Sequence, residues 1–534
     1  MWKRLLLTLT LALSLATAAS ALETEVTMRS LVNVSGGVEL SYHVASSADQ
    51  AVEGLALAAL YDAKGALLDL QAQTVELAAG GWQDMRFLFD PQNAASSAKV
   101  FVLDSMSGLR PLSAAGSIKL SEEVPIGSWA ELVEQAAKAP AGTVFRLRGG
   151  AIPCDSELKL KATRPLTIRG SDKGTTILDF SAWSDGLLNT EKEVSATGIS
   201  INGSNVTLEN LIVQGAPGVG VRMRGSGSGY NLAQNVVARY NHNSGFYLSD
   251  SAHHCTLRQC DAYRNLDIYK KGQDADGFSV SLSLGAHTLL DNCRAFENAD
   301  DAYDNFNNHN DVTYLDCYAW NNGGIDCYTG QQDVDRGLPV DRDLGLVRLM
   351  CKESPAFAEA LDQGRFVLPL EMKVVVRKAD KSGPEEVTLG EYITTVWEGN
   401  GNGFKLGSGD SSHGPIVGPE GFRRLERCIS FDNYAKGFDR NNGRFTTSVT
   451  SFLSFGNRKR NYWSDQLADP MVKNALSYNG GEPNGTDQNF PITALDAVRG
   501  EAMAQTVYRR TAELEELLRS DIIPGRFLID PVWS

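Results

Sequence analysis

A repeat of about 24 residues is the feature of this chain that most constrains its fold. A six-residue motif that begins with an apolar residue, often Cys, and ends with Asn starts at positions 236, 260, 293, 317, 428 and 452, with weaker copies at 211 and 475. The successive intervals are 25, 24, 33, 24, 111, 24 and 23 residues, so one unit length holds apart from two insertions. Such a period is typical of a solenoid, whose units bury their apolar sides only by stacking on one another.

A second motif follows nine residues after the start of a repeat, at Gly245-Phe246, Ala302-Tyr303 and Gly437-Phe438. The two interrupted units carry its equivalents at Gly277-Phe278 and Gly403-Phe404. Short strands, turn residues and this period predict an all-β fold, a parallel β-helix with internal ladders of Cys, aromatic and Asn side chains. A leucine-rich repeat is the alternative solenoid, but its Leu spacing is missing.

The two insertions add 8 residues before Gly277 and 77 residues before Gly403. Long excursions from a rigid scaffold usually carry or cover a functional site. We therefore expect the functional residues near these coils, and an inserted subdomain over about 323–397.

The regions on either side of the repeat have different sequence patterns. Short alternating or apolar runs separated by Gly-rich turns predict a small accessory β-sandwich over residues 22–118. The β-helix domain then takes 119–534, with a helix starting after Ser128 and a C-terminal helix over about 496–518.

The N-terminus has the pattern of an export signal over residues 1–21. Trp2-Lys3-Arg4 is basic, residues 5–18 are largely apolar, and residues 19–21 are small. A membrane anchor is the alternative, but the apolar run is too short to span a bilayer comfortably. We expect a secreted protein, extracellular or periplasmic.

The net charge of −15 makes binding to nucleic acid or anionic lipid by charge alone unfavourable. A polyanionic substrate would need a cation to mediate its binding. We expect a monomer with no stable membrane span.

Eight cysteines are present, and export permits disulfides. Cys260, Cys293, Cys317 and Cys428 occupy equivalent places in the repeat, and we interpret them as buried packing residues. A disulfide between Cys327 and Cys351 is a plausible pairing.

Carboxylates gather around two neighbouring coils. Asp276 is equivalent to Asp301 one coil away, Asp300 is adjacent, and Asp304 follows the inward Tyr303, so its side chain points outward. Four unpaired carboxylates at a strand spacing of about 4.8 Å would repel one another. A hard cation such as Ca²⁺, which takes six to eight oxygen ligands, resolves this repulsion. Solvated turn aspartates are the alternative.

Lys405 follows the inward Phe404 and is expected to point outward in one column with Asp304 and Asp439. A surface lysine paired with one of these carboxylates is the plain interpretation. Beside a cation, however, its pKa would fall and Lys405 would become a possible general base.

The segments that contain Asp276 (274–278), Asp300 to Asp304 (297–304) and Lys405 (401–407) resemble the motifs of pectate lyases of polysaccharide lyase family nine. The resemblance spans roughly residues 195–480. It implies a right-handed parallel β-helix that cleaves pectate by Ca²⁺-assisted β-elimination and leaves 4,5-unsaturated oligouronides. It also implies Ca²⁺ ligands at Asp276, Asp300, Asp301 and Asp304, and a catalytic base at Lys405.

Two departures from the family affect the binding cleft: Ala302-Tyr303 stands where members usually carry Gly-Trp, and the long insertion is unusual. We expect the substrate to be an acidic polysaccharide, contacted also by Asp439, Arg440 and Asn402. A glycoside hydrolase or epimerase on the same fold, and a non-catalytic carbohydrate-binding surface protein, are the alternatives.

Overall fold

The computed structural model describes residues 23–34, 36–161, 163–191, 196–282, 285, 287–407, 422–441, 445–463, 471–480, 492–531 and 533. The expected export signal, residues 1–21, lies outside them.

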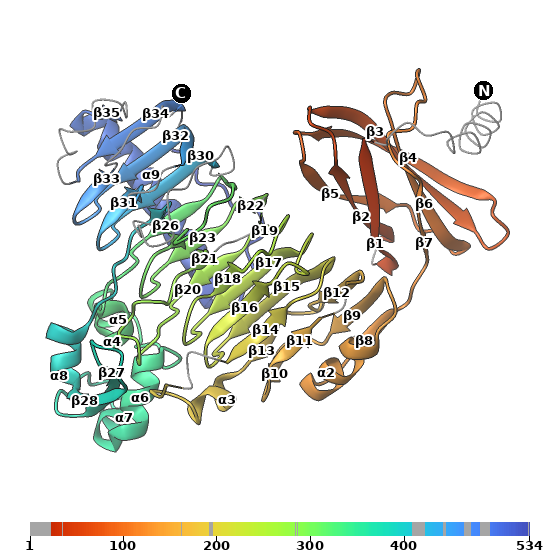
Figure 1. The fold of residues 1–534 in the computed structure, drawn as a ribbon. Helices are drawn as coiled ribbons and strands as arrows, with labels where there is room; N and C mark the ends of the chain where they lie inside the picture. Colours follow the sequence, from red (N-terminus) through yellow and green to blue (C-terminus); the bar gives the residue numbers. More distant parts are fainter. Residues whose placement is uncertain are drawn as a thin grey trace.

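The N-terminal part is a β-sandwich, as expected (Figure 1). One antiparallel sheet has the order β1-β2-β5 and the other β4-β3-β6-β7. Apolar side chains such as Leu31, Leu40 and Val100 fill the core of this part. The strands are β1 (Thr24–Val34), β2 (Gly37–Ser46), β3 (Val52–Asp62), β4 (Leu67–Leu77), β5 (Trp82–Phe89), β6 (Ala95–Leu103) and β7 (Gly116–Lys119).

The rest of the chain is built around a stack of parallel strands, a right-handed β-helix, which confirms the predicted fold class. In the described residues, one sheet of 17 strands and one of nine strands run the length of the stack. The larger sheet contains β8 (Glu123–Ile126), β9 (Thr143–Leu147), β10 (Gly150–Pro153), β12 (Leu166–Arg169), β13 (Thr176–Asp179), β15 (Val206–Gln214), β17 (Leu232–Arg239), β19 (Thr256–Arg258), β20 (Asp261–Tyr263), β22 (Thr288–Asp291), β23 (Arg294–Phe296), β25 (Val312–Leu315), β26 (Tyr318–Trp320), β30 (Phe422–Phe431), β32 (Thr446–Phe455), β34 (Met471–Tyr478) and β35 (Ile492–Ala494).

The smaller sheet contains β11 (Leu158–Leu160), β14 (Thr197–Ile201), β16 (Val219–Arg224), β18 (Phe246–Ser249), β21 (Phe278–Val280), β24 (Tyr303–Asp304), β29 (Phe404–Lys405), β31 (Lys436–Asp439) and β33 (Arg460–Trp463). Its neighbours pair in parallel and one strand comes from each coil, so residues far apart in sequence stand side by side along the stack.

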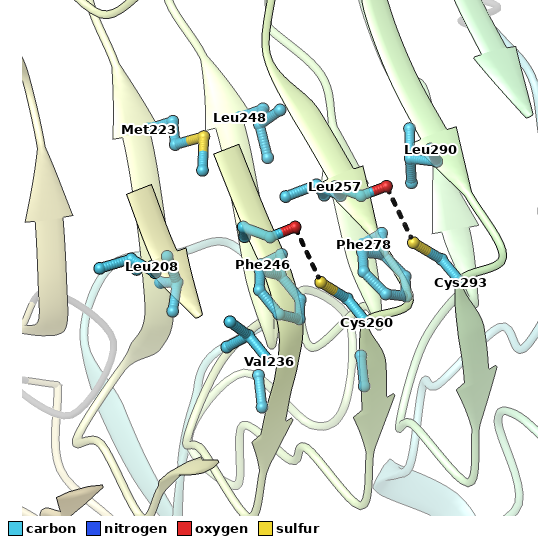
Figure 2. Packing of buried hydrophobic residues seen from close by; sticks show 14 of the residues in the cluster. Leu208, Met223, Val236, Phe246, Leu248, Leu257, Cys260, Phe278, Leu290 and Cys293 are labelled. Atoms are coloured by element: carbon cyan, nitrogen blue, oxygen red, sulfur yellow. Dashed lines mark hydrogen bonds between the residues drawn. The ribbon is translucent and has the colours of Figure 1, made fainter. Parts of the chain in front are cut away.

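The internal ladders predicted from the repeat are present. Phe246, Phe278, Tyr303 and Phe404 stack in sequence, with ring centroids 5.0, 5.2 and 4.6 Å apart. The four cysteines of the repeat are fully buried beside them. Figure 2 shows this packing, with the thiols of Cys260 and Cys293 donating to carbonyls of the preceding coil.

The Asn ladder is a chain of amide hydrogen bonds that joins successive coils. Asn265 donates through Nδ2 to Oδ1 of Asn298 (2.8 Å), and Asn298 donates in the same way to Asn322 (3.1 Å). The residue before each of these Asn adopts a left-handed conformation, for example Arg264 (φ 55°) and Glu297 (φ 53°), which turns the chain at the same corner of each coil.

The long insertion folds into short helices and a two-stranded antiparallel sheet. It packs on the short insertion, since the Tyr392 hydroxyl donates to the Ile268 carbonyl (3.3 Å) and the Arg377 amide to the Tyr269 carbonyl (2.8 Å). The elements are α4 (Asp326–Thr329), α5 (Gln331–Asp335), α6 (Gly345–Glu353), α7 (Pro355–Asp362), β27 (Lys373–Arg377), β28 (Pro384–Thr388), α8 (Leu389–Glu391) and the π-helix η2 (Tyr392–Val396).

Cys327 and Cys351 lie in this insertion, and the suggested disulfide between them is wrong: both are free thiols. Cys327 is buried in α4, where its thiol contacts the Gln332 side chain, and Cys351 is partly exposed on α6.

A helix covers the first coils of the stack, and another packs along one side of it. Ser128 caps α2 (Trp129–Lys138) by accepting the Glu131 amide (3.3 Å), and Trp129 is buried at the first coils. The expected C-terminal helix is α9 (Ala497–Arg519), whose Glu515 accepts a hydrogen bond from Trp320 (2.9 Å). A short helix, α3 (Ser181–Asp185), follows β13. None of the helices described is both long and apolar enough to cross a membrane.

Charged groups of the sandwich contact the β-helix. Arg29 of β1 pairs with Asp84 (2.7 Å) and donates to the Thr207 hydroxyl (3.0 Å) on β15. Arg86 of β5 pairs with Glu209 (2.8 Å), also on β15. Burial would raise the pKa of Asp84, but Arg29 and His43 outweigh it and hold that pKa well below its ordinary range.

The Asn ladder predicts a stability effect. Asn298→Ala removes the acceptor of Asn265 and the donor to the Ala262 carbonyl (2.9 Å). Each buried group left without a partner costs about 1–3 kcal/mol, so the urea midpoint and the Tm should fall clearly. Asn93→Ala, at an exposed turn, is the matched control and should leave both unchanged. Equal midpoints for the two variants would contradict a structural role for the ladder.

Candidate active site

The register of the smaller sheet sets the direction of the side chains around the two insertions. Tyr303 pairs with Phe404, and Phe404 with Phe438, and all three rings are buried in the core of the stack. Because side chains alternate along a strand, the next residue on each coil points outward. Asp304, Lys405 and Asp439 are therefore partners on successive coils, in the column expected from the sequence.

Three carboxylates from two neighbouring coils converge at this column. One oxygen each of Asp276, Asp301 and Asp304 lies within 4.8 Å of the others. All three residues are buried, and Asp301 is fully so. The backbone holds the group: the Asp301 amide donates to Asp276 Oδ1 (3.3 Å), and the Phe306 amide donates to Asp304 Oδ1 (2.9 Å).

Asp300 lies beside this cluster, and its carboxylate has a different contact. Its Oδ1 accepts the backbone amide of Asn400 (3.0 Å), at the point where the long insertion rejoins the coil. The Asp300 charge still acts on the cluster, since it raises the pKa of Asp276.

Lys405 is embedded in the cluster. Its Nζ lies 2.8 Å from Asp301 Oδ2 and 3.4 Å from Asp304 Oδ1, and its side chain is only 14% exposed. Burial alone would lower the pKa of Lys405, but the surrounding carboxylates, Asp301 first, raise it well above its ordinary value. Lys405 is therefore a buried ammonium held by Asp301 and Asp304, which differs from the exposed surface lysine of the plain interpretation.

The carboxylates are crowded, and this crowding changes their pKa values. Burial, and then the charges of Asp304, Asp300 and Asp301, raise the pKa of Asp276 well above its ordinary value. Burial raises the pKa of Asp304 to about 6, with Asp301 adding to the rise and Lys405 opposing it. The site thus holds more negative charge than one lysine neutralises.

The other three candidate residues lie close by with defined contacts. Asn402 donates from its backbone amide (2.9 Å) and its side chain (2.7 Å) to Asp301 Oδ1, so it orients that carboxylate. Asp439 pairs with Lys436 (2.7 Å). Arg440 is buried and donates to the Phe445 carbonyl (2.9 Å).

Sequence reasoning missed the orienting contacts of Asn400 and Asn402 and the pairing of Lys436 with Asp439. Lys436 opens β31 three residues before Asp439, and strict alternation along a strand would place the two on opposite faces, so the repeat gave no signal of their pairing. The amide contacts have no sequence signal either, because they depend on where the long insertion returns to the coil.

The donor set fits a hard divalent cation. All its donors are carboxylate oxygens, the chemistry that such cations prefer. Asp301 Oδ2 is buried, accepts no hydrogen bond in the described part of the chain, and lies 2.8 Å from the Lys405 ammonium. A cation bound at this oxygen would share it with Lys405.

Comparison with known proteins bears on the same coils. The model of the family described as "Pel9A-like, right handed beta helix region" matches residues 119–337, which include the four aspartates. Pectate lyase L of Dickeya chrysanthemi is 23% identical over 297 residues, or 56% of this chain and 51% of that protein. Pectate lyase PEL9 of Emericella nidulans is 23% identical over 423 residues, or 73% of this chain and 86% of that protein.

The crystal structure of pectate lyase Pel9A overlaps 71% of this chain and 78% of that one, at 19% identity and a TM-score of 0.48. The chain spans about half the length of the first curated relatives it matches. The resemblance seen in the sequence motifs is confirmed: residues 119–337 match the Pel9A-like right-handed β-helix region.

Proposed function

We propose that this protein is a secreted, Ca²⁺-dependent polysaccharide lyase that cleaves pectate by β-elimination. The observation that carries the proposal is the contact of Lys405 Nζ with Asp301 in a buried cluster of three carboxylates. The proposed base and the proposed cation site would thus lie side by side on the outward face of neighbouring coils. Similarity to pectate lyases supports the choice of substrate.

Asp276, Asp301 and Asp304 would hold the cation, with Asp300 beside them. When bound, Ca²⁺ would offset their charge and stabilise the negative charge that develops on a uronate carboxylate. Asn402 keeps Asp301 in place through two hydrogen bonds, so its role is to position a ligand.

Lys405 would act as the base. The C5 proton of a uronate is acidic because C5 lies next to the carboxylate. Without a cation the carboxylates keep Lys405 protonated; a cation bound among them would offset their charge and lower the pKa of Lys405. In its neutral form Lys405 would then take that proton on Nζ, the electron pair would form the C4–C5 double bond, and the C4–O4 bond would break. The departing oxygen is protonated from solvent. One product therefore ends in a 4,5-unsaturated uronate, and no water is added across the cleaved bond.

Residues 1–21 would direct export, residues 22–118 would be an accessory domain, and 119–534 would carry the catalysis. Asn402, and Asp439 and Arg440 on the coil that follows Lys405, would contact substrate. A monomer would suffice, because all the proposed site residues come from one chain.

Calcium binding can be measured without any assay of activity. Asp276→Asn removes one of the crowded charges but keeps an acceptor for the Asp301 amide. We expect it to raise the Tm in EDTA and to weaken the rise in Tm that Ca²⁺ causes in the wild type. Asp439→Asn is the control, since Asp439 is paired with Lys436 outside the cluster; its Ca²⁺ response should match the wild type.

A wild-type Tm that does not respond to millimolar Ca²⁺, or an Asp276→Asn variant that responds as strongly as the wild type, would argue against a cation site at these residues.

The base is tested by kinetics on polygalacturonate, followed by the ultraviolet absorbance of the unsaturated product. Lys405→Ala should lower kcat by roughly a hundred- to ten-thousand-fold, the contribution of a general base. Lys405→Arg should not restore it, because guanidinium holds its proton more firmly. Lys473→Ala, at an exposed lysine on β34, is the matched lysine control and should keep most of the activity. If Lys405→Ala retained more than about a tenth of wild-type kcat, another group would have to be the base.

A further inference from the structure

The outward column that contains the cluster continues along the smaller sheet in both directions. Its members pair coil by coil as Cα partners, and they are Ser200, Arg222, Tyr247, Ser279, Asp304, Lys405, Asp439 and Trp463. A polymer lying along the stack and over Lys405 would pass these side chains in order. Arg222 stands three coils from Asp304, which is roughly 14 Å at the spacing of strands in a sheet.

Arg222 is a partly exposed cation without an ion-pair partner among the described residues. Its guanidinium stacks on the ring of Tyr247 on the next coil, 4.7 Å from the ring centroid. Its Nε is buried and donates to no acceptor in the described chain. The column has two cations, Arg222 and Lys405, and Lys405 is ion-paired with Asp301 and Asp304. Among the described residues, Arg222 is therefore the cation of this column that lacks an ion-pair partner.

Arg224, two residues further along β16 and on the same face, shows the ordinary case. Its guanidinium pairs with Asp250 on the adjacent coil. The two arginines therefore differ in their capacity to bind an anion. The charge of Arg224 is already neutralised by Asp250, whereas the guanidinium of Arg222 can still donate hydrogen bonds to an anionic ligand.

The stacking on Tyr247 holds Arg222 in one orientation, so little side-chain freedom remains to be lost on binding. A planar guanidinium presents two parallel N–H donors to a carboxylate. Tyr247 adds a partly buried aromatic face beside those donors. Burial raises the pKa of Tyr247, and Arg222 and the Ser281 hydroxyl oppose that rise, so its phenol stays a neutral group at physiological pH.

We propose that Arg222 and Tyr247 form a distal subsite that binds a carboxylate of an acidic polysaccharide chain, three coils from Asp304. The subsite rests on the proposed function, because the same chain would lie over Lys405. It would make affinity grow with chain length, since only an oligouronide long enough to reach from Lys405 to Arg222 gains the contact.

The test measures binding apart from turnover. Oligogalacturonides of increasing length are titrated, with Ca²⁺ present, into the Lys405→Ala protein and into the same protein with Arg222→Gln, Arg222→Lys or Arg224→Gln added. Arg222→Gln should weaken binding of the long oligomers by roughly 10- to 100-fold, as for a charge-assisted hydrogen bond, and weaken binding of the shortest ones much less. Arg222→Lys should recover part of the loss. Arg224→Gln should bind like its parent.

The second part of the experiment uses carboxyl-reduced oligomers, which carry no charge. The Arg222→Gln protein should bind these oligomers as tightly as its parent does. A loss that is the same at every length, a loss equal to that of Arg224→Gln, or a loss that persists on the reduced oligomers would overturn the subsite. Unchanged Tm values for the variants show that the fold is intact.

The outcomes separate the two proposals. Length-dependent binding through Arg222 in a wild-type protein that makes no unsaturated product would support the subsite and refute the lyase. A working lyase whose Arg222→Gln variant binds long oligomers as tightly as its parent would support the lyase and refute the subsite.

Discussion

The stacking of coils in strict register is the constraint on which the rest of this structure depends. Each coil places one strand beside the equivalent strand of its neighbour, so a residue type that recurs in sequence becomes a ladder in space. Inward, this brings Phe278, Tyr303 and Phe404 into one stack of rings. Outward, the same register forces Asp304 and Lys405 together, because each follows an inward aromatic residue.

The crowding of charge at the site is a consequence of that register. Asp276 and Asp301 occupy equivalent positions on adjacent coils and cannot move apart without breaking the parallel pairing around Phe278. A rigid scaffold can hold like charges in this way, at a cost in stability that a cation would relieve. The two insertions, which pack on each other, lie next to this place and fix the return of the chain at Asn400 and Asn402.

Much of this arrangement was predictable, because a repeat converts spacing in sequence into position in space. The fold class, the inward ladders and the outward column of Asp304, Lys405 and Asp439 all follow from it. The contacts of Asp300 and Asn402 do not, since both lie at the corner where the insertion rejoins the coil. The position of Cys327 in the sequence also did not indicate that it would be buried as a free thiol. The docking of Arg29 on Thr207 joins parts of the chain with no shared pattern. The repeat could have placed Arg222 and Tyr247 in the column. Only the structure shows that Arg224 has an ion-pair partner and that Arg222 stacks on Tyr247 instead.

The most direct test of the central claim asks whether water enters the cleaved bond. Polygalacturonate is digested in water labelled with oxygen-18, and the masses of the products are measured by mass spectrometry. Elimination predicts that the new non-reducing end is lighter by one water than a hydrolysis product and that the cleavage step places no label in either product. Products of full hydrolytic mass, with one labelled oxygen for each bond cut, would contradict the account and favour a hydrolase on the same fold.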